Sequence, residues 1–223
     1  MNTLYNNNAG SCTAVGYSAL GWSSGANNTA VGSNCSENIT TGANNTAVGK
    51  SALTTLTTGN ENVAVGESAL LAATTGYNNV AIGFVAGYAI TTGNSNVCVG
   101  ESSLASCETG YQNVAIGHLA LNNYTGSANV AVGKNAGGST TGYCNTFLGY
   151  YAGRNNTSGC CNIAIGRAVC LPSATTNNQF AIGSGTCHWI TGDANFNVGI
   201  GTNRHDTIVG SAVTAKLSVG ILS

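Results

Sequence analysis

A four-residue motif that ends in glycine recurs along almost the whole chain. It reads Val-Ala-Val-Gly at 63–66 and Val-Ala-Ile-Gly at 80–83. Eleven copies occur, and their glycines are separated by 16 or 17 residues. An altered twelfth copy, Val-Gly-Ile-Gly at 198–201, follows 18 residues after the eleventh glycine. A fixed short period is typical of a chain whose repeats stack on one another.

Each repeat has the composition of β-structure. The motif alternates β-branched residues with Ala, and Asn, Gly and Thr precede it. A second short segment after the glycine, such as Ser51–Leu53, predicts a second strand in each coil. The sequence therefore predicts an all-β chain, a parallel β-solenoid or β-roll of about twelve coils of 16–17 residues. At about 4.8 Å per coil the rod would be roughly 55–60 Å long.

The repeats also suggest the domain organisation. Residues 10–201 are expected to form the solenoid, and residues 1–9 form a short segment before it. Residues 202–223 lie beyond the last motif and are expected to lead into another region.

The composition argues against several functional classes. Only 6% of the 223 residues are charged, against roughly a quarter in ordinary domains. Six scattered Lys and Arg do not form a phosphate-binding patch, so nucleic acid is not an expected partner. No apolar run approaches the length of a membrane span. Neither a catalytic triad, a calcium motif nor a dinucleotide motif is recognisable. The sequence therefore predicts no enzymatic activity, no cofactor, no metal and no membrane insertion.

Stacking in register places equivalent residues in columns along the rod. One column stands four residues before the motif glycine and contains Asn28, Asn45, Asn62, Asn79, Asn96, Asn113, Asn129, Asn145 and Asn162, followed by Gln179. Stacked Asn amides form hydrogen-bonded ladders, so this column is expected to be structural. A second column, eight residues before the glycine, contains Ser24, Thr41, Thr58, Thr75, Thr92, Thr109, Thr125, Thr141, Ser158 and Thr175.

The motif strand is apolar on both faces. In the copy at 63–66, Val63 and Val65 point one way and Ala64 points the other. Strands that are apolar on both sides are normally covered on both sides. A coil has one interior, so the sequence predicts that identical chains cover the second face.

Two pairs of the nine cysteines share a position in neighbouring repeats. Cys144 and Cys161 stand five residues before their glycines, and Cys170 and Cys187 stand four residues after theirs. Stacked neighbours fall within disulfide range, so both pairs are predicted to be close. They could be bridged in an oxidising setting or remain a column of small buried thiols. Cys35 and Cys98 occupy Ala positions and are expected to be core residues.

Aromatic residues provide candidate contacts for a receptor or a sugar. Tyr77, Tyr111 and Tyr143 share one position, six residues before the glycine, and are expected to point outwards. Trp22 and Trp189 lie near opposite ends of the chain. Exposed aromatic rings can stack on sugars, although isolated exposed aromatics are ordinary on protein surfaces.

The repeat at 75–87, TGYNNVAIGFVAG, resembles the head repeats of trimeric autotransporter adhesins and related repeats of phage and giant-virus tail fibres. The segments 197–202 and 215–219 resemble the region that in fibre proteins precedes a coiled coil and an endosialidase-type intramolecular chaperone. This resemblance implies a homotrimeric fibre of parallel, intertwined or side-by-side β-coils, on a virion surface or at a cell surface. The bacterial adhesin heads have a shorter period than this chain.

Three functions are compatible with these features. The first is a non-enzymatic fibre or adhesin segment, a rigid shaft and surface for attachment to a host or cell. The second is a filament-forming, matrix-type protein that polymerises end to end. The third is an ice-binding solenoid, suggested by the threonine column.

Overall fold

The computed structural model describes residues 10–138, 141–195 and 197–200, which contain thirteen β-strands in one sheet. No helix occurs among these residues. The strands are β1 (Thr13–Val15), β2 (Thr29–Val31), β3 (Thr46–Val48), β4 (Val63–Val65), β5 (Val80–Ile82), β6 (Val97–Val99), β7 (Val114–Ile116), β8 (Val130–Val132), β9 (Thr146–Leu148), β10 (Ile163–Ile165), β11 (Phe180–Ser184), β12 (Cys187–Gly192) and β13 (Val198–Ile200).

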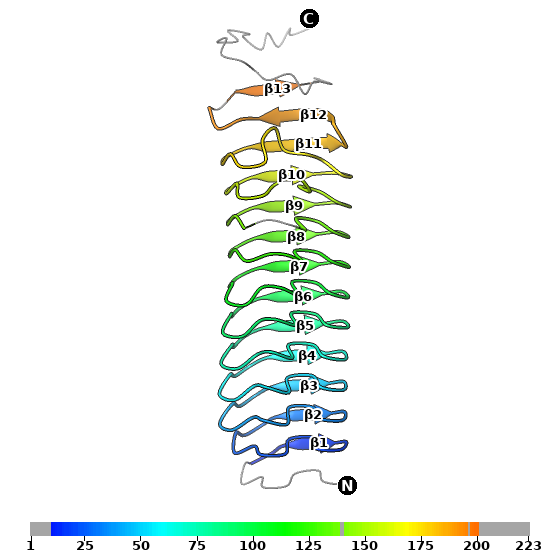
Figure 1. Ribbon diagram of the computed structural model, residues 1–223, viewed down its shortest axis with the longest axis vertical. Coiled ribbons are helices and arrows are strands. Elements are labelled where there is room, and N and C mark those ends of the chain that lie inside the picture. The colour runs from blue at the N-terminus through cyan, green and yellow to red at the C-terminus, as the bar shows by residue number, and fades with distance from the viewer. Residues whose placement is uncertain (1–9, 139–140, 196, 201–223) are drawn as a thin grey trace, which may run out of the picture.

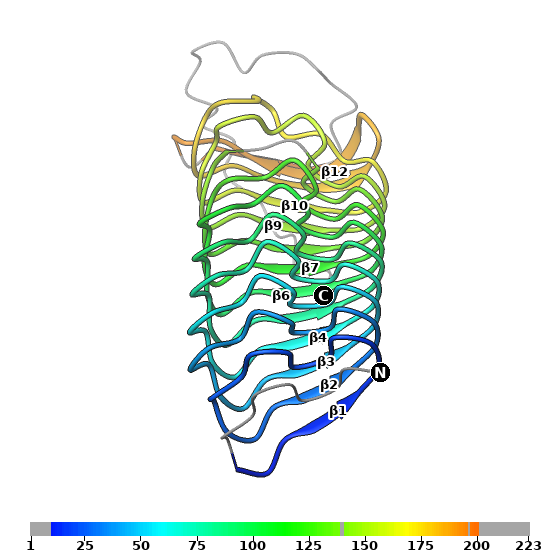
Figure 2. The same cartoon turned by 60° about the horizontal axis from the view of Figure 1, so that its bottom comes forward.

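The first eleven strands pair in parallel and in register. Val63 of β4 lies opposite Val80 of β5, and Ala64 lies opposite Ala81. Each strand is followed by turns that return the chain to the start of the next strand, so β1 to β11 enclose ten coils (Figure 1). The strands lie along one side of the coils and the turns along the other (Figure 2). The predicted all-β parallel solenoid is confirmed.

The predicted second strand of each coil is absent from the described coils. In the coil after β3, residues 50–55 form turns, and Ser51 and Leu53 have φ values of 56° and 51°. These alternating left-handed residues cannot belong to an extended strand. The turn segments still stack, because Leu53 donates its N–H to the carbonyl of Ala69 and Ser51 to that of Ser33. One three-residue strand therefore suffices for each regular coil.

The core is a narrow column of small and aliphatic side chains. The central strand residue, Ala64 in β4, is fully buried, as are Ala52 and Leu53 after the preceding glycine. Cys35 and Cys98 are also fully buried at Ala positions, which confirms that they are core residues. Burial raises the pKa of the Cys35 thiol to about 11.

The C-terminal end departs from the expected twelve coils. After β11 the chain reverses at Gly185, which has a φ of 60°, and β12 pairs antiparallel with β11. β13 then pairs antiparallel with β12. The twelfth motif, which contributes β13, therefore belongs to an antiparallel extension of the sheet and not to a further coil. The solenoid predicted over 10–201 ends as coils near β11. The expectation for 202–223 lies outside the described residues.

Candidate functional site

The asparagine column forms a continuous hydrogen-bonded ladder inside the stack. Asn79 Oδ1 accepts from both the backbone N–H (3.0 Å) and Nδ2 (3.1 Å) of Asn96 in the next coil. Its own Nδ2 donates to Asn62 Oδ1 at 3.1 Å. The ladder starts at Cys12, whose Sγ accepts from the N–H of Asn28, and reaches the N–H of Gln179. The expected structural role of this column is supported by these bonds, since each amide joins two coils.

A second glycine column, which the sequence analysis missed, completes this ladder. Asn79 Nδ2 also donates to the carbonyl of Gly93 at 2.9 Å, and Asn62 Nδ2 donates to that of Gly76 at 2.9 Å. These glycines stand seven residues before the motif glycine in nine successive repeats. A Cβ at Gly76 would overlap the carbonyl of Gly93. The constant spacing was the signal that could have identified them.

In the 17-residue coils, the threonine column that bonds one coil to the next lies one residue earlier in the sequence than predicted. The hydroxyl of Thr57 donates to the carbonyl of Thr74 at 3.0 Å, and that of Thr74 to the carbonyl of Thr91 at 3.2 Å. The predicted neighbours Thr58 and Thr75 are exposed.

The cause of this shift lies in the 16-residue coils. Ser24 and Thr141, from 16-residue coils, donate to the carbonyls of Thr40 and Thr157 and so join the Thr57 column. Those coils therefore lack the residue that corresponds to Thr58. The residue eight places before the motif glycine is therefore the equivalent of Thr58 in a 17-residue coil and of Thr57 in a 16-residue coil. The hydroxyls of the Thr57 column donate to carbonyls at a corner of the coil, so they do not form a flat strand face.

The outer face of the sheet is a long apolar strip. The first and third residues of each regular strand point away from the core, and Ile82, Ile116 and Leu148 are 41%, 38% and 46% exposed. In the strands β1 to β11 these outward positions hold Val, Ile, Leu, Thr or Phe, and none is charged. Eleven strands at about 4.8 Å spacing and three residues of about 3.3 Å give a strip of roughly 50 by 10 Å. The largest apolar patch of a protein surface is commonly of about this size and is often functional.

A mixed column of charged and aromatic residues follows the motif glycine beside this strip. Lys50 Nζ lies 3.0 Å from Glu67 Oε1 in the next coil. Further along the column Arg167 lies over the Tyr150 ring, 5.9 Å from its centroid. Phe84 in the same column is 52% exposed. The charges are thus concentrated at the edge of the strip, where contacts between exposed ions contribute little stability.

The predicted aromatic residues are exposed. Tyr77, Tyr111 and Tyr143 are between 47% and 55% exposed, and Trp22 and Trp189 are 57% and 64% exposed. The three tyrosines recur in every second coil, which places them about 10 Å apart along one row. The two tryptophans do not belong to that row. Trp22 lies in turns and Trp189 lies in β12.

The cysteine pairs have different outcomes. All cysteines are free thiols. Cys144 and Cys161 are both exposed and occupy equivalent turns of neighbouring coils. Cys187 does not continue the column of Cys170, because it lies in the antiparallel strand β12 opposite Ser184. Cys170 is buried and accepts from Arg154 Nε at 3.4 Å. Stacking therefore supports the first pair and gives no reason to pair Cys170 with Cys187.

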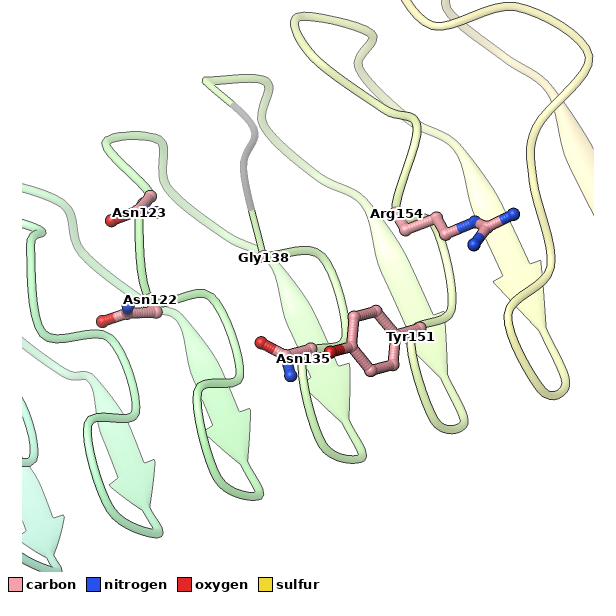
Figure 3. A pocket seen from close by; sticks show the side chains of 6 residues that line it. All are labelled: Asn122, Asn123, Asn135, Gly138, Tyr151 and Arg154. Atoms are coloured by element: carbon pink, nitrogen blue, oxygen red, sulfur yellow. The ribbon is translucent and has the colours of Figure 1, made fainter.

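A shallow polar hollow lies beside the two consecutive 16-residue coils that end at Gly133 and Gly149. Its volume is about 160 Å³, and its lining residues are Asn122, Asn123, Asn135, Gly138, Tyr151 and Arg154. Tyr151 extends towards Asn135 of the preceding coil, while Arg154 projects along the stack (Figure 3). Amide, phenol and guanidinium groups could hydrogen-bond a small polar molecule there. No motif in the sequence predicted this hollow.

No group of three or more His, Cys, Asp and Glu residues that could hold a metal ion occurs in the described ranges. The same ranges contain no helix of the length and hydropathy needed to span a membrane. Comparisons of the chain with protein families, curated proteins and solved structures found no match.

Proposed function

We propose that the chain is a non-enzymatic structural fibre segment that assembles with copies of itself through the outer face of the sheet. The observation that carries this proposal is the uncharged apolar strip on β1 to β11. The strip alone offers roughly 500 Å² per chain. A standard interface buries about 800 Å² per partner, so the strip with its flanking column is of the size that association requires.

Three copies, as expected from the sequence, are the proposed assembly. The column after the motif glycine adds the exposed rings of Tyr17, Phe84 and Tyr150 beside the strip, among charged side chains such as that of Lys50. Two adjoining surfaces, the strip and this column, can contact two neighbours, one on each side. Side-by-side chains would bury the strip and give a stiff shaft, since every coil is already tied to the next by the asparagine ladder.

The mass in solution tests this proposal. The chain has a mass of 22.2 kDa, and we expect light scattering and native mass spectrometry to give three times that value. A double Ile82→Lys, Ile116→Lys variant places two charges on the strip while leaving the core untouched, and it should have the mass of one chain. The matched control, Thr75→Lys with Thr109→Lys, adds the same charges in the same coils at exposed turn residues and should remain trimeric.

The outcomes separate the alternatives. A single-chain mass for the unmodified protein, or a trimer that tolerates the Ile82→Lys, Ile116→Lys change, would contradict assembly through this face. A series of polymers of variable length would instead favour the filament-forming function, in which rods join through their ends. Freezing-point measurements address the ice-binding alternative, for which we expect no thermal hysteresis.

The exposed tyrosine row is the proposed attachment surface of the fibre. Its rings recur about every 10 Å, a geometry that suits a repeating glycan chain at a virion or cell surface. We expect binding of the assembled protein to a glycan array to be lost when Tyr77, Tyr111 and Tyr143 are changed together to Ser. The change should leave the mass of the assembly unaltered. Equal glycan binding by the variant would remove the row from the proposal.

A further inference from the structure

Three cysteines lie in the two neighbouring turns that precede β9 and β10. Cys144 lies in one coil, and Cys160 and Cys161 lie in the next. Cys144 and Cys161 are both exposed and have the same left-handed φ of 56°. They are therefore equivalent residues of stacked turns, whose side chains leave the backbone in the same direction.

Backbone hydrogen bonds fix the spacing of these turns. The N–H of Cys161 donates to the carbonyl of Tyr143 at 3.0 Å, and the N–H of Cys144 donates to the carbonyl of Ser127 at 3.2 Å. Stacked backbones at this spacing place equivalent Cα atoms about 4.8 Å apart, and disulfides span Cα distances of about 4.4–6.8 Å. Side chains of this column do meet elsewhere, since Asn27 Nδ2 donates to Asn44 Oδ1 at 3.1 Å.

The third thiol is directed to a different partner. Cys160 is buried, and its Sγ accepts from the N–H of Tyr143 at 3.4 Å. A bond between Cys160 and Cys161 would join adjacent residues within one turn. The pKa of the Cys161 thiol is raised by desolvation, with the neighbouring Cys144 and Cys160 thiols acting in the same direction. Both thiols therefore lie near Cys161, and the equivalent turn position of Cys144 makes it the partner across the two coils.

We propose that Cys144 and Cys161 form a disulfide between neighbouring coils when a low-molecular-weight disulfide such as oxidised glutathione is present. The thiolate of one cysteine attacks a glutathione sulfur and releases one glutathione thiolate. The second cysteine thiolate then attacks the protein sulfur of the mixed disulfide and releases the second glutathione. Two protein thiols are oxidised to one S–S bond, and one glutathione disulfide is reduced to two thiols.

The bond would clamp the turn that carries Tyr143. It joins positions 17 residues apart, one coil of the solenoid, and so restricts the unfolded chain. Oxidation would therefore set how firmly the coils that end at β9 and β10 are joined, independently of whether chains associate.

Peptide mapping of the full chain tests the proposal. Folded protein is incubated with oxidised glutathione, blocked with an alkylating reagent and digested without reduction. We expect a linked pair of peptides containing Cys144 and Cys161, and a rise of about 5 °C in the unfolding midpoint relative to the reduced protein. Cys161→Ser should abolish both the linked peptides and the rise.

The matched control is Cys160→Ser. This change removes the neighbouring thiol but should leave the Cys144–Cys161 linkage and the rise in the midpoint intact. The proposal is overturned if Cys144 and Cys161 both remain alkylated in the oxidised protein, or if Cys144 is found linked to Cys160. Circular dichroism of each variant establishes that the chain is folded before oxidation.

Discussion

In the middle coils the four-residue motif is followed by a coil, whereas at the C-terminal end of the sheet the same motif is followed by a hairpin. After Gly66 the chain leaves the strand, buries Ala69 and Leu70, and returns for another parallel strand. After Gly183 the strand continues to Ser184, turns at Gly185 and runs back as β12. The motif alone therefore does not specify a coil.

The difference lies three and four residues after the glycine. The middle coil has Ala69 and Leu70 at these places, both fully buried. The last copy has Thr186 and Cys187, which are exposed. Regular coils bury the side chain at the first of these places, as at Cys35 and Ala86, whereas the second place also holds Ser36 and Gly87. With an exposed Thr186 at the first place, the chain turns at Gly185–Thr186 and forms a hairpin instead. The return path, more than the strand, decides where the solenoid ends.

The largest expected difference in stability between the two regions follows from substitution of their glycines. Gly66 has a φ of 136°, and a Cβ there would overlap the carbonyl of Gly83 in the next coil. We expect Gly66→Ala to cost about 5 kcal/mol, from backbone strain and overpacking together. Gly185 has a φ of 60° with open space around it, so Gly185→Ala should cost only about 1 kcal/mol. Urea denaturation of the two variants measures the contrast, and equal losses would contradict the tight stacking of the middle coils.

Transferring the end sequence into the middle tests the return path directly. Ala69→Thr with Leu70→Cys gives a middle coil the residues that follow Gly183. We expect a loss of about 4 kcal/mol, because the core loses methylene groups and gains a buried hydroxyl. The single changes Glu67→Ser and Ser68→Gly, which copy the two positions before that pair, should each cost less than about 1 kcal/mol. A nearly neutral double variant would show that another feature ends the solenoid.

The asparagine ladder should also weaken towards the end. Asn79→Ala would leave the buried N–H of Asn96 and the carbonyl of Gly93 without their partners, at a cost of about 3 kcal/mol. Gln179 bonds mainly within its own turn, to Ser173 and Thr176, so Gln179→Ala should cost about 1 kcal/mol. Thermal unfolding of both variants checks the order. A larger loss at Gln179 would reverse the comparison.

The sequence predicted what depends on exact repetition. The period gave the parallel register, the Ala column gave the core, and the constant position of Asn gave the ladder. The prediction was wrong where turn residues resemble strand residues, and where a coil lacks one residue of the repeat. Ser51 and Leu53 look like strand residues, but their left-handed φ values come from stacking of the turn. Thr58 has no counterpart in the 16-residue coils, and counting from one glycine could not reveal that.

The apolar outer face followed from the alternation of the strand residues, whereas the polar hollow did not. Asn122, Asn135 and Tyr151 line the hollow from three successive coils. Their proximity depends on how the corners of neighbouring coils stack. The sequence of a single repeat does not show that stacking. The antiparallel end was hidden for a related reason, since its motif is similar and only the following residues differ.

Distances between coils test the in-register stack most directly. Nitroxides can be attached to a non-natural amino acid at Lys50 and, in separate samples, at Glu67, Lys134 or Arg167, which leaves the cysteines unchanged. Labelled chains are diluted with unlabelled ones so that pulsed electron resonance reports distances within one chain. These positions are one, five and seven coils from Lys50, and we expect the distance to grow by about 4.8 Å per coil, reaching roughly 24 and 34 Å for the last two. Distances that do not increase in proportion to the number of coils would contradict the account.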